Sequence, residues 1–454
     1  MKQLVETLRH YFQGGKTREI EFRIGKLKQL KKAILDREEK IEAALWDELH
    51  KSAYESYLTE ISFVLQELDA HIKHVKSWSK PQKVATPLQL FGSKSRIVYE
   101  PLGVVLIIAP WNYPFQLLMS PLIGAVSAGN CAVLKPSPYT PKVGAVMREI
   151  IEAVFEPGHV VLVTGGKEVN QALLAERFDY LFFTGSPALG KVVMKAAAEY
   201  LTPVTLELGG KSPCIVGQEA NLELAARRIV WGKCLNAGQT CIAPDYLFVH
   251  TSVKSRLLER IIGYIRHFYG EQIKESSDYP RIVCREAAER IAGLIENELV
   301  VYGGEVDLDS CFIAPTLLEV MEQDAPVMQE EIFGPVLPIL QFQKTEEVIR
   351  YINEHDKPLA LYYFGRTAEA RRIMAATTSG GVCVNDTIMH IANAHLPFGG
   401  VGHSGMGRYH GKESFLTFSN RRSVLYATTK WDLPFRYPPY PKLKFLKKLP
   451  GFSS

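Results

Sequence analysis

From residue 102 onward, short apolar segments alternate with helical segments, and this alternation restricts the chain to one class of fold. The apolar segments contain few polar positions, which is typical of strands buried on both faces of a parallel sheet. Helical patterns at 142–155 and 168–177 separate several of them. The segments are GVVLIIA (103–109), CAVLK (131–135), VVLVTG (160–165), YLFFTG (180–185) and PVTLELGG (203–210). They predict an α/β domain whose parallel sheet is covered by helices on both faces.

A second series of the same kind begins after residue 211. The chain has 454 residues, enough for two or three domains of ~100–200 residues each. We therefore predict two doubly wound parallel-sheet α/β domains, with the seam between them near Gly209–Gly210. The second series comprises strands at PCIVG (213–217), DYLFVH (245–250) and GGVCVN (380–385), with helical patterns at 221–235, 252–269 and 345–354.

The remaining segments differ in character from the α/β core. Residues 17 to about 78 carry an amphipathic helical pattern, and Ser52 with Glu55 fits a capping box that opens one helix. Between residues 83 and 101, proline and glycine interrupt short alternating runs, which predicts a β-hairpin forming an arm. The tail KLKFLKKLPGF (442–452) is basic and apolar but too short to span a bilayer. We interpret it as a surface or interface arm; peripheral membrane contact is the alternative.

Composition excludes several classes of function. The formal net charge of +4 is small for this length and does not require a nucleic-acid partner. No apolar run reaches membrane-spanning length, and the N-terminus does not resemble a secretory signal. Seven cysteines without paired spacing favour reduced thiols and a cytoplasmic protein. No metal-ligand cluster is evident, so we expect chemistry without a bound metal.

The stretch NAGQTCIAP (236–244) contains the most unusual cysteine. Cys241 lies in a glycine-rich turn, where backbone N–H groups can lower a thiol pKa and so activate it as a nucleophile. The alternative is a small buried residue, as expected for most cysteines. Three others fit that alternative because they lie in predicted strands or a predicted helix: Cys214, Cys234 and Cys383.

Three polar residues at predicted strand ends are further candidates. Glu207, in TLELGGK, is either a solvated strand position or a general base with a raised pKa. Asn112, in APWNYPF, is either a turn residue or a donor to an oxyanion. Lys135 ends the strand CAVLK and is either a surface charge or a cation that reaches a ribose or phosphate.

FTGSPALGK (183–191) predicts a helix that begins directly after a strand. Ser186 is a suitable N-cap, followed by a proline at the first helical position. The free N–H groups of such a helix start suit the pyrophosphate of a dinucleotide, although any capped helix has them. GVGHSG (400–405) matches G-x-G-x-x-G but lacks a preceding strand and a following βαβ unit, so we discount it.

Taken together, the motifs resemble those of the aldehyde dehydrogenase superfamily. PWNYP, KPS, FTGS-x-x-x-GK, LELGGK, GQTC, EEIFGPV and LPFGGVG-x-SG occur in one order over residues 105–405. The run GMGRYHGKESFLTFSNRRSV and the short N-terminus are most similar to the class 3 branch. The resemblance covers roughly residues 15 to 440, and so many ordered motifs make chance similarity implausible.

The resemblance implies a three-part subunit that forms a homodimer. Its three parts are a Rossmann-like cofactor domain (1–82 and 102–209), a catalytic domain (210–395) and an oligomerisation arm (83–101 and 412–430), and a C-terminal tail (431–454) follows them.

The resemblance also implies a role for each site residue. Cys241 is the nucleophile, Glu207 the general base, and Asn112 forms the oxyanion hole with the backbone N–H of Cys241. Lys135 contacts the adenosine ribose of NAD or NADP. Further cofactor contacts fall on Gly185, Ser186 and Gly190 (pyrophosphate), Glu331 and Phe333 (nicotinamide ribose and ring), and Trp111, Ser137 and Leu208.

Two positions depart from the family pattern. Pro138 stands where NAD-preferring members commonly carry an acidic residue, so either dinucleotide is expected. His403 stands where asparagine is expected, and nothing follows from it.

The implied reaction oxidises a medium- or long-chain aliphatic or an aromatic aldehyde to a carboxylic acid through a thiohemiacetal and a thioester on Cys241. Three alternatives are an acylating, coenzyme A-dependent dehydrogenase, a catalytically silent scaffold of the same fold, and a cysteine hydrolase.

Overall fold

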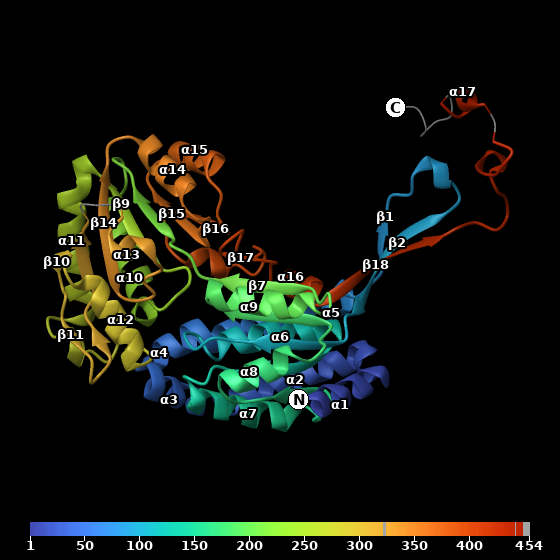
Figure 1. Cartoon of the computed structure of the whole chain (residues 1–454), viewed down its shortest axis with the longest axis horizontal. Coiled ribbons are helices and arrows are strands. Elements are labelled where there is room, and N and C mark those ends of the chain that lie inside the picture. Colours follow the sequence, from blue (N-terminus) through green and yellow to red (C-terminus); the bar gives the residue numbers. More distant parts are fainter. Residues whose placement is uncertain (321–323, 441, 448–454) are drawn as a thin grey trace.

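The computed structural model describes residues 1–320, 324–440 and 442–447. Two large sheets with their helices form a body, and a smaller three-stranded sheet forms an arm that projects from it (Figure 1). The α/β class with parallel sheets is confirmed.

The first unit is built on a six-stranded sheet of order β17-β7-β6-β3-β4-β5. All strands run parallel except β17, which pairs antiparallel with β7. The five predicted strands are present, because apolar runs of this length are stable only when both faces are covered. The strands are β3 (Val104–Ile108), β4 (Cys131–Lys135), β5 (Val160–Leu162), β6 (Tyr180–Gly185), β7 (Val204–Leu208) and β17 (Gly405–Met406).

Alternate side chains of each strand pack into two separate cores. Val105 and Ile107 pack with helices α6 (Gln116–Ala128) and α7 (Pro141–Val154). On the other face, Val104, Leu106 and Ile108 pack with three helices. These are α1 (Lys2–Gln13), which the sequence analysis did not predict, α8 (Lys167–Leu174) and α9 (Pro187–Ala198).

The second unit is built on a seven-stranded sheet of order β10-β13-β14-β9-β8-β15-β16. Only β10 runs antiparallel. The sequence analysis identified three of these strands, β8 (Pro213–Val216), β9 (Tyr246–His250) and β16 (Gly381–Val384). The others are β10 (Leu299–Tyr302), β13 (Thr316–Glu319), β14 (Val336–Phe342) and β15 (Ala360–Phe364). The main helices are α10 (Leu222–Cys234), α11 (Lys254–Tyr269), α12 (Arg285–Ile295), α14 (Thr345–Glu354) and α15 (Thr367–Ala376).

The N-terminal region is helical, as predicted, but one predicted cap is only half formed. Ser52 accepts a hydrogen bond from the N–H of Glu55 (3.3 Å), as a capping box requires. The Glu55 carboxylate does not complete the box, because it accepts from the N–H of Asn236 instead (2.8 Å). The helices are α2 (Ile20–Leu35), α3 (Glu38–Leu49), α4 (Ala53–Ser56), a π-helix labelled η2 (Tyr57–Ile61) and α5 (Ser62–Trp78).

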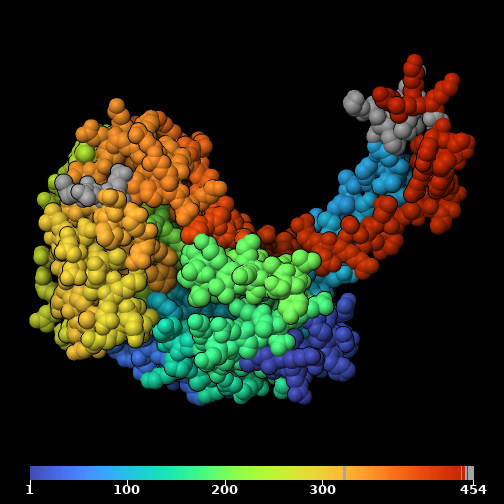
Figure 2. All heavy atoms as spheres, viewed as in Figure 1, coloured from blue at the N-terminus to red at the C-terminus, as the bar shows by residue number. Residues whose placement is uncertain are grey.

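The arm consists of the predicted hairpin and a strand from the C-terminal part. β1 (Gln82–Val84) and β18 (Ser419–Tyr426) both pair antiparallel with β2 (Lys94–Pro101). Figure 2 shows the arm standing clear of the body on the viewed face. Residues 412–417, which the sequence analysis included in the arm, form helix α16 (Lys412–Thr417), which packs on α6 in the body.

The C-terminal tail is described only in part. A short helix, α17 (Leu443–Leu446), forms in it, and positions 448–452 of the predicted basic segment lie outside the described residues. No helix within the described ranges is both long and apolar enough to cross a bilayer.

A buried carboxylate on α5 fixes α16 to the body. Glu67 accepts hydrogen bonds from the N–H of Gly411 (2.8 Å), from Ser414 Oγ (3.0 Å) and from His71 Nε2 (3.1 Å). Burial alone would raise the pKa of Glu67, but these hydrogen bonds and nearby positive charge lower it to about 2. A pKa below the ordinary value of 4.5 means that ionised Glu67 stabilises the fold above that pH.

We expect Glu67→Gln to lower the free energy of unfolding at pH 7 by on the order of 2–3 kcal/mol. The difference from wild type should shrink between pH 4.5 and pH 2, because Glu67 of the unfolded wild-type chain becomes protonated there while Glu67 of the folded protein stays ionised. Urea unfolding at pH 7 and pH 3.5 measures both values. An equal difference at the two pH values would contradict this account.

Candidate active site

A cavity of about 230 Å³ lies where the carboxyl ends of β3, β6 and β7 meet the second unit. All the predicted site residues line it except Lys135, Ser137 and Gly190. Since these residues come from segments far apart in sequence, the fold alone brings them together. The lining consists of Pro110, Trp111, Asn112, Leu117, Thr184, Gly185, Ser186, Glu207, Leu208, Gly209, Cys241, Glu331 and Phe333.

Cys241 follows a tight turn that only an unusual backbone can make. Asn236, Ala237 and Gly238 all have positive φ values, of 51°, 51° and 74°. A Cβ on Gly238 would lie 2.2 Å from the carbonyl oxygen of Gly334, so only glycine fits this close approach. The turn is thereby pressed against the loop that carries Glu331.

The environment of Cys241 differs from the one predicted. The side chain is partly accessible, but burial raises the pKa of the thiol well above its ordinary value, and the carboxylates of Glu331 and Glu207 raise it further. The backbone N–H groups of Cys241 and Ile242 lower it only in part. The expected activation by N–H groups is therefore outweighed by desolvation, which no local sequence pattern reveals.

Glu207 is a buried carboxyl without a hydrogen-bond partner among the described residues. It lies on β7 between β6 and β17, paired with Thr184 and Gly405. Burial raises its pKa well above the ordinary value, and the nearby Arg408 lowers it only partly. Because neither oxygen accepts a hydrogen bond from the described protein, the carboxyl can engage a water or substrate group in the cavity.

Asn112 is held by both its backbone and its side chain. Its carbonyl oxygen accepts from Asn236 Nδ2 (2.7 Å) and Lys51 Nζ (3.3 Å), and its Nδ2 donates to the carbonyl of Gln239 (2.9 Å). An amide nitrogen carries two N–H groups, so one remains for a ligand oxygen. The side chain is buried and forms part of the cavity wall.

Three predicted cofactor residues lie outside this cavity. Lys135 ends β4 at the same edge of the sheet, is buried, donates to the carbonyl of Pro136 (2.8 Å), and has its pKa lowered to about 8 by burial. Ser137 accepts from the N–H of Tyr139 (3.2 Å). Gly190 lies in α9, where a Cβ would be 2.7 Å from Leu208 Cδ2, so it permits close packing of α9 on β7.

The loop carrying Glu331 and Phe333 is anchored by two residues that the sequence analysis missed. Lys211 pairs with Asp245 and donates to the carbonyls of Val327 (2.9 Å) and Glu330 (2.8 Å). Asp245 accepts from the N–H of Ile332 (3.0 Å). The sequence feature that could have identified Lys211 as a site residue is its position directly after the glycine pair of LELGGK.

Glu331 lies over the connection between the two sheets. A Cβ on Gly209 would fall 1.9 Å from Glu331 Oε2, so the carboxyl occupies space that any other residue at 209 would fill. Burial raises the pKa of Glu331 to about 8. Its neighbour Phe333 packs edge-to-face on Trp111, with ring centroids 5.4 Å apart.

The residues present fit a nicotinamide dinucleotide. A neighbouring cavity of about 320 Å³ shares Gly209 and Glu331 with the first and reaches Pro187 at the start of α9. Ser186 is the N-cap of α9, as predicted, and accepts from the N–H of Leu189 (3.4 Å). The helix start suits a pyrophosphate, the aromatic pair of Trp111 and Phe333 offers a wall for a ring, and Lys135 is a nearby buried cation.

Comparisons with known proteins find chains of similar sequence and fold. A sequence model described as "Aldehyde dehydrogenase family" matches residues 1–424. The chain is 47% identical to a 4,4'-diaponeurosporen-aldehyde dehydrogenase of Staphylococcus aureus (strain NCTC 8325 / PS 47) over 96% of each chain. It is 46% identical to a dimeric NADP-preferring aldehyde dehydrogenase of Rattus norvegicus, covering 96% of this chain and 97% of the relative. A solved structure titled "Substrate bound state of Staphylococcus Aureus AldH" superposes with a TM-score of 0.96 at 46% identity, covering 98% of each chain.

Glu331 and Cys241 line the same cavity, and the charge of Glu331 raises the thiol pKa, which predicts a pH-dependent thiol reactivity. Because the pKa of Glu331 is about 8, its charge appears only above neutral pH and then opposes ionisation of Cys241. We expect Glu331→Gln to accelerate alkylation of Cys241 by iodoacetamide about threefold to tenfold at pH 9, with little effect at pH 6. Mass spectrometry of the Cys241 peptide gives the rate.

Glu330→Gln is the matched control, because Glu330 is exposed and pairs with Arg290 (2.9 Å) on the surface. It should leave the rate unchanged. An acceleration by Glu331→Gln that is equal at both pH values would exclude the charge effect.

Proposed function

This chain belongs to the aldehyde dehydrogenase family, and we propose that it oxidises aldehydes through a covalent intermediate on Cys241. Its relatives include family 3 members. It is an aldehyde dehydrogenase that uses NAD or NADP. The observation that carries the proposed mechanism is the single cavity lined by Cys241, Asn112 and Glu207.

In the first step, the thiol of Cys241 gives its proton to water as its sulfur adds to the aldehyde carbon, and the carbonyl oxygen gains the negative charge. The free N–H of Asn112 and the backbone N–H of Cys241 donate to that oxygen. A fixed donor of this kind is typically worth ~3–4 kcal/mol of barrier, because it needs no reorganisation in a site that excludes water.

The cofactor would lie along the two adjoining cavities. Gly185, Ser186 and the start of α9 would hold the pyrophosphate, Lys135 the adenosine ribose, and Glu331 the nicotinamide ribose, while Phe333 and Trp111 flank the ring. Gly190 would act indirectly, by letting α9 pack on β7. When bound, the nicotinamide would supply a hydride acceptor for the carbon attached to Cys241, and loss of hydride from that carbon would leave a thioester.

Glu207 completes the reaction. It deprotonates a water that attacks the thioester, and the products are a carboxylic acid and the free thiol of Cys241. Because its pKa is raised, Glu207 is a stronger base once it is ionised than an ordinary carboxylate. Its unpartnered oxygens leave it able to bind that water. An acylating enzyme that passes the thioester to coenzyme A would have no use for such a base.

The proposed substrates are medium- or long-chain aliphatic and aromatic aldehydes. Apolar side chains from Trp111, Leu117 and Phe333 on the cavity wall support an apolar substrate, and the named S. aureus relative acts on a diaponeurosporen aldehyde. Pro138 offers no carboxylate to repel the additional phosphate of NADP, which supports the use of either dinucleotide.

We further propose a cytoplasmic homodimer. All seven cysteines, each within the described ranges, are free thiols, which suits a reducing compartment. The rat relative is named as dimeric, which supports a dimer here.

Stopped-flow absorbance of reduced nicotinamide tests the proposed roles with octanal and NAD or NADP. We expect Glu207→Gln to give a burst of about one equivalent per active site and then stall, because hydride transfer precedes the hydrolysis that needs the base. Cys241→Ser should give neither burst nor turnover. Steady turnover by Cys241→Ser would overturn the covalent mechanism, and unchanged steady turnover by Glu207→Gln would overturn the role of Glu207.

A further inference from the structure

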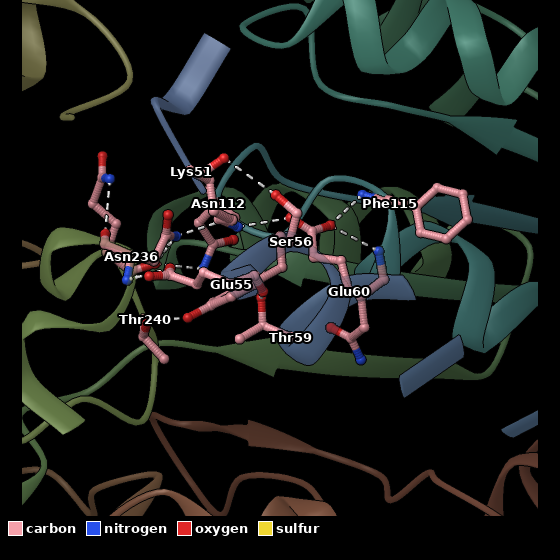
Figure 3. A network of polar contacts seen from close by, with 12 residues as sticks. Lys51, Glu55, Ser56, Thr59, Glu60, Asn112, Phe115, Asn236 and Thr240 are labelled. Carbon is pink, nitrogen blue, oxygen red and sulfur yellow. Dashed lines mark hydrogen bonds and ion pairs between the residues drawn. The ribbon is translucent and has the colours of Figure 1, made fainter. Parts of the chain in front are cut away.

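Two acidic side chains, one in a π-helical turn of the N-terminal region and one just before it, point into the protein interior. The turn, η2, spans Tyr57–Ile61 between α4 and α5. Glu60 lies within this turn, and Glu55 lies on α4 directly before it. Glu55 and Glu60 are both buried, at 8% and 0% exposure. Glu55 lies beside Asn236, and Glu60 lies beside Phe115 (Figure 3).

Glu60 and Lys51 anchor the segment that carries Asn112. One oxygen of Glu60 accepts from the N–H groups of Phe115 (2.9 Å) and Gln116 (3.1 Å), at the start of α6. The other pairs with Lys51 Nζ (2.7 Å), whose side chain is fully buried. Lys51 Nζ also donates to the carbonyl of Asn112 (3.3 Å). The Lys51–Glu60 ion pair therefore holds the segment at Asn112 and again at Phe115 and Gln116.

Glu55 anchors the turn that precedes Cys241. Its carboxyl accepts from the N–H of Asn236 (2.8 Å), which has a left-handed backbone. The side chain of Asn236 then donates from Nδ2 to the carbonyls of Asn112 (2.7 Å) and Gln239 (3.1 Å). The latter carbonyl is the one that accepts from the Asn112 amide (2.9 Å).

The two sets of contacts converge on the groups that orient the Asn112 amide. One set fixes the Asn112 backbone, and the other fixes the Gln239 carbonyl that holds its side chain. Neither Lys51, Glu55 nor Glu60 lines the catalytic cavity. A buried ion pair is weak support for stability in itself, because desolvation offsets most of its attraction. Stability alone therefore does not explain why the Lys51–Glu60 pair is buried beside the segment that carries Asn112.

We propose that Lys51, Glu55 and Glu60 are positioning residues that fix the Asn112 amide in its orientation towards the oxygen of the substrate adduct. The proposal rests on the oxyanion role of Asn112 proposed above. The N-terminal helices thereby contribute to catalysis in the cavity where the two units meet, without touching substrate or cofactor.

The requirement at position 55 is an acceptor for the N–H of Asn236. Burial raises the pKa of Glu55 to about 7, with Lys51 opposing the rise. Glutamine has nearly the same shape and keeps an acceptor oxygen, whereas leucine removes it and leaves the N–H buried without a partner. Glu55→Gln is therefore the conservative variant, and Glu55→Leu the disruptive one.

The test measures the rate constant of the reduced-nicotinamide burst with octanal and saturating NAD. We expect Glu55→Leu to lower it about tenfold or more, and Glu55→Gln to stay close to wild type. Asn112→Ala alone should lower it by about 10²–10³. Adding Glu55→Leu to Asn112→Ala should then change it by less than about twofold, because the two act through one group. Alkylation of Cys241 forms no oxyanion, so its rate should be unchanged in Glu55→Leu.

Asp179→Leu is the matched control. Asp179 also accepts a backbone N–H from a distant segment, Val104 (2.8 Å), and pairs with a basic residue of an N-terminal helix, Arg9 (2.9 Å). Asp179 lies at the end of the strands opposite the catalytic cavity, so its substitution should not change the burst rate. If Glu55→Leu does not fold, the Asn236→Asp variant is used as the disruptive variant instead. Aspartate tolerates the same left-handed backbone, but its side chain cannot donate to the carbonyls of Asn112 and Gln239.

The outcomes separate this proposal from the one on which it rests. An undiminished burst in Asn112→Ala would overturn the oxyanion role and the positioning role together. A slowed burst in Asn112→Ala, with a fully additive effect of Glu55→Leu, would overturn only the positioning role. Equal losses of burst rate in Glu55→Leu and Asp179→Leu would show that the network only stabilises the fold, and would also overturn the positioning role.

Discussion

The close approach of three backbone segments is the constraint on which the whole site depends. A Cβ on Gly209 would lie 1.9 Å from the Glu331 carboxyl, one on Gly238 would lie 2.2 Å from the Gly334 carbonyl, and one on Gly405 would lie 2.1 Å from the Leu206 carbonyl. Each contact is possible only without a side chain. The first contact joins the two units, and the other two lie within one unit each. A thiol, an amide and two carboxyls from distant segments share the cavity that results. Neither α/β unit contains this set of groups by itself.

Desolvation follows from that closure and sets the chemistry of the resting site. Burial raises the pKa of Cys241, Glu207 and Glu331, so the protonated, neutral forms are favoured. The same dryness strengthens any hydrogen bond to a developing charge, which increases the value of a fixed donor such as Asn112. Such a donor must itself be held rigidly, and the buried contacts from Lys51, Glu55 and Glu60 provide a physical reason for charged groups deep in the N-terminal helices.

Much of the fold could be predicted from the sequence, because strands buried on both faces leave continuous apolar runs such as CAVLK and YLFFTG. Most of the candidate site could also be predicted, but only because ordered motifs place Cys241, Glu207 and Asn112 in a known pattern. What could not be predicted depends on contacts between distant residues. The raised pKa of Cys241 arises from burial that a glycine-rich turn does not reveal. Glu55 fits a local capping box, yet its carboxyl bonds to Asn236, 181 positions away. Lys51 and Glu60 carry no local signal for burial.

Direct observation of the acyl group on Cys241 would test the central claim of a covalent mechanism most directly. The Glu207→Gln protein would be mixed with octanal and NAD, quenched in acid after the burst, digested and analysed by mass spectrometry. The account predicts that the peptide containing Cys241, and no other cysteine peptide, gains the mass of one octanoyl group in place of a hydrogen. A burst of reduced nicotinamide with an unmodified Cys241, or with the acyl group on another cysteine, would contradict it.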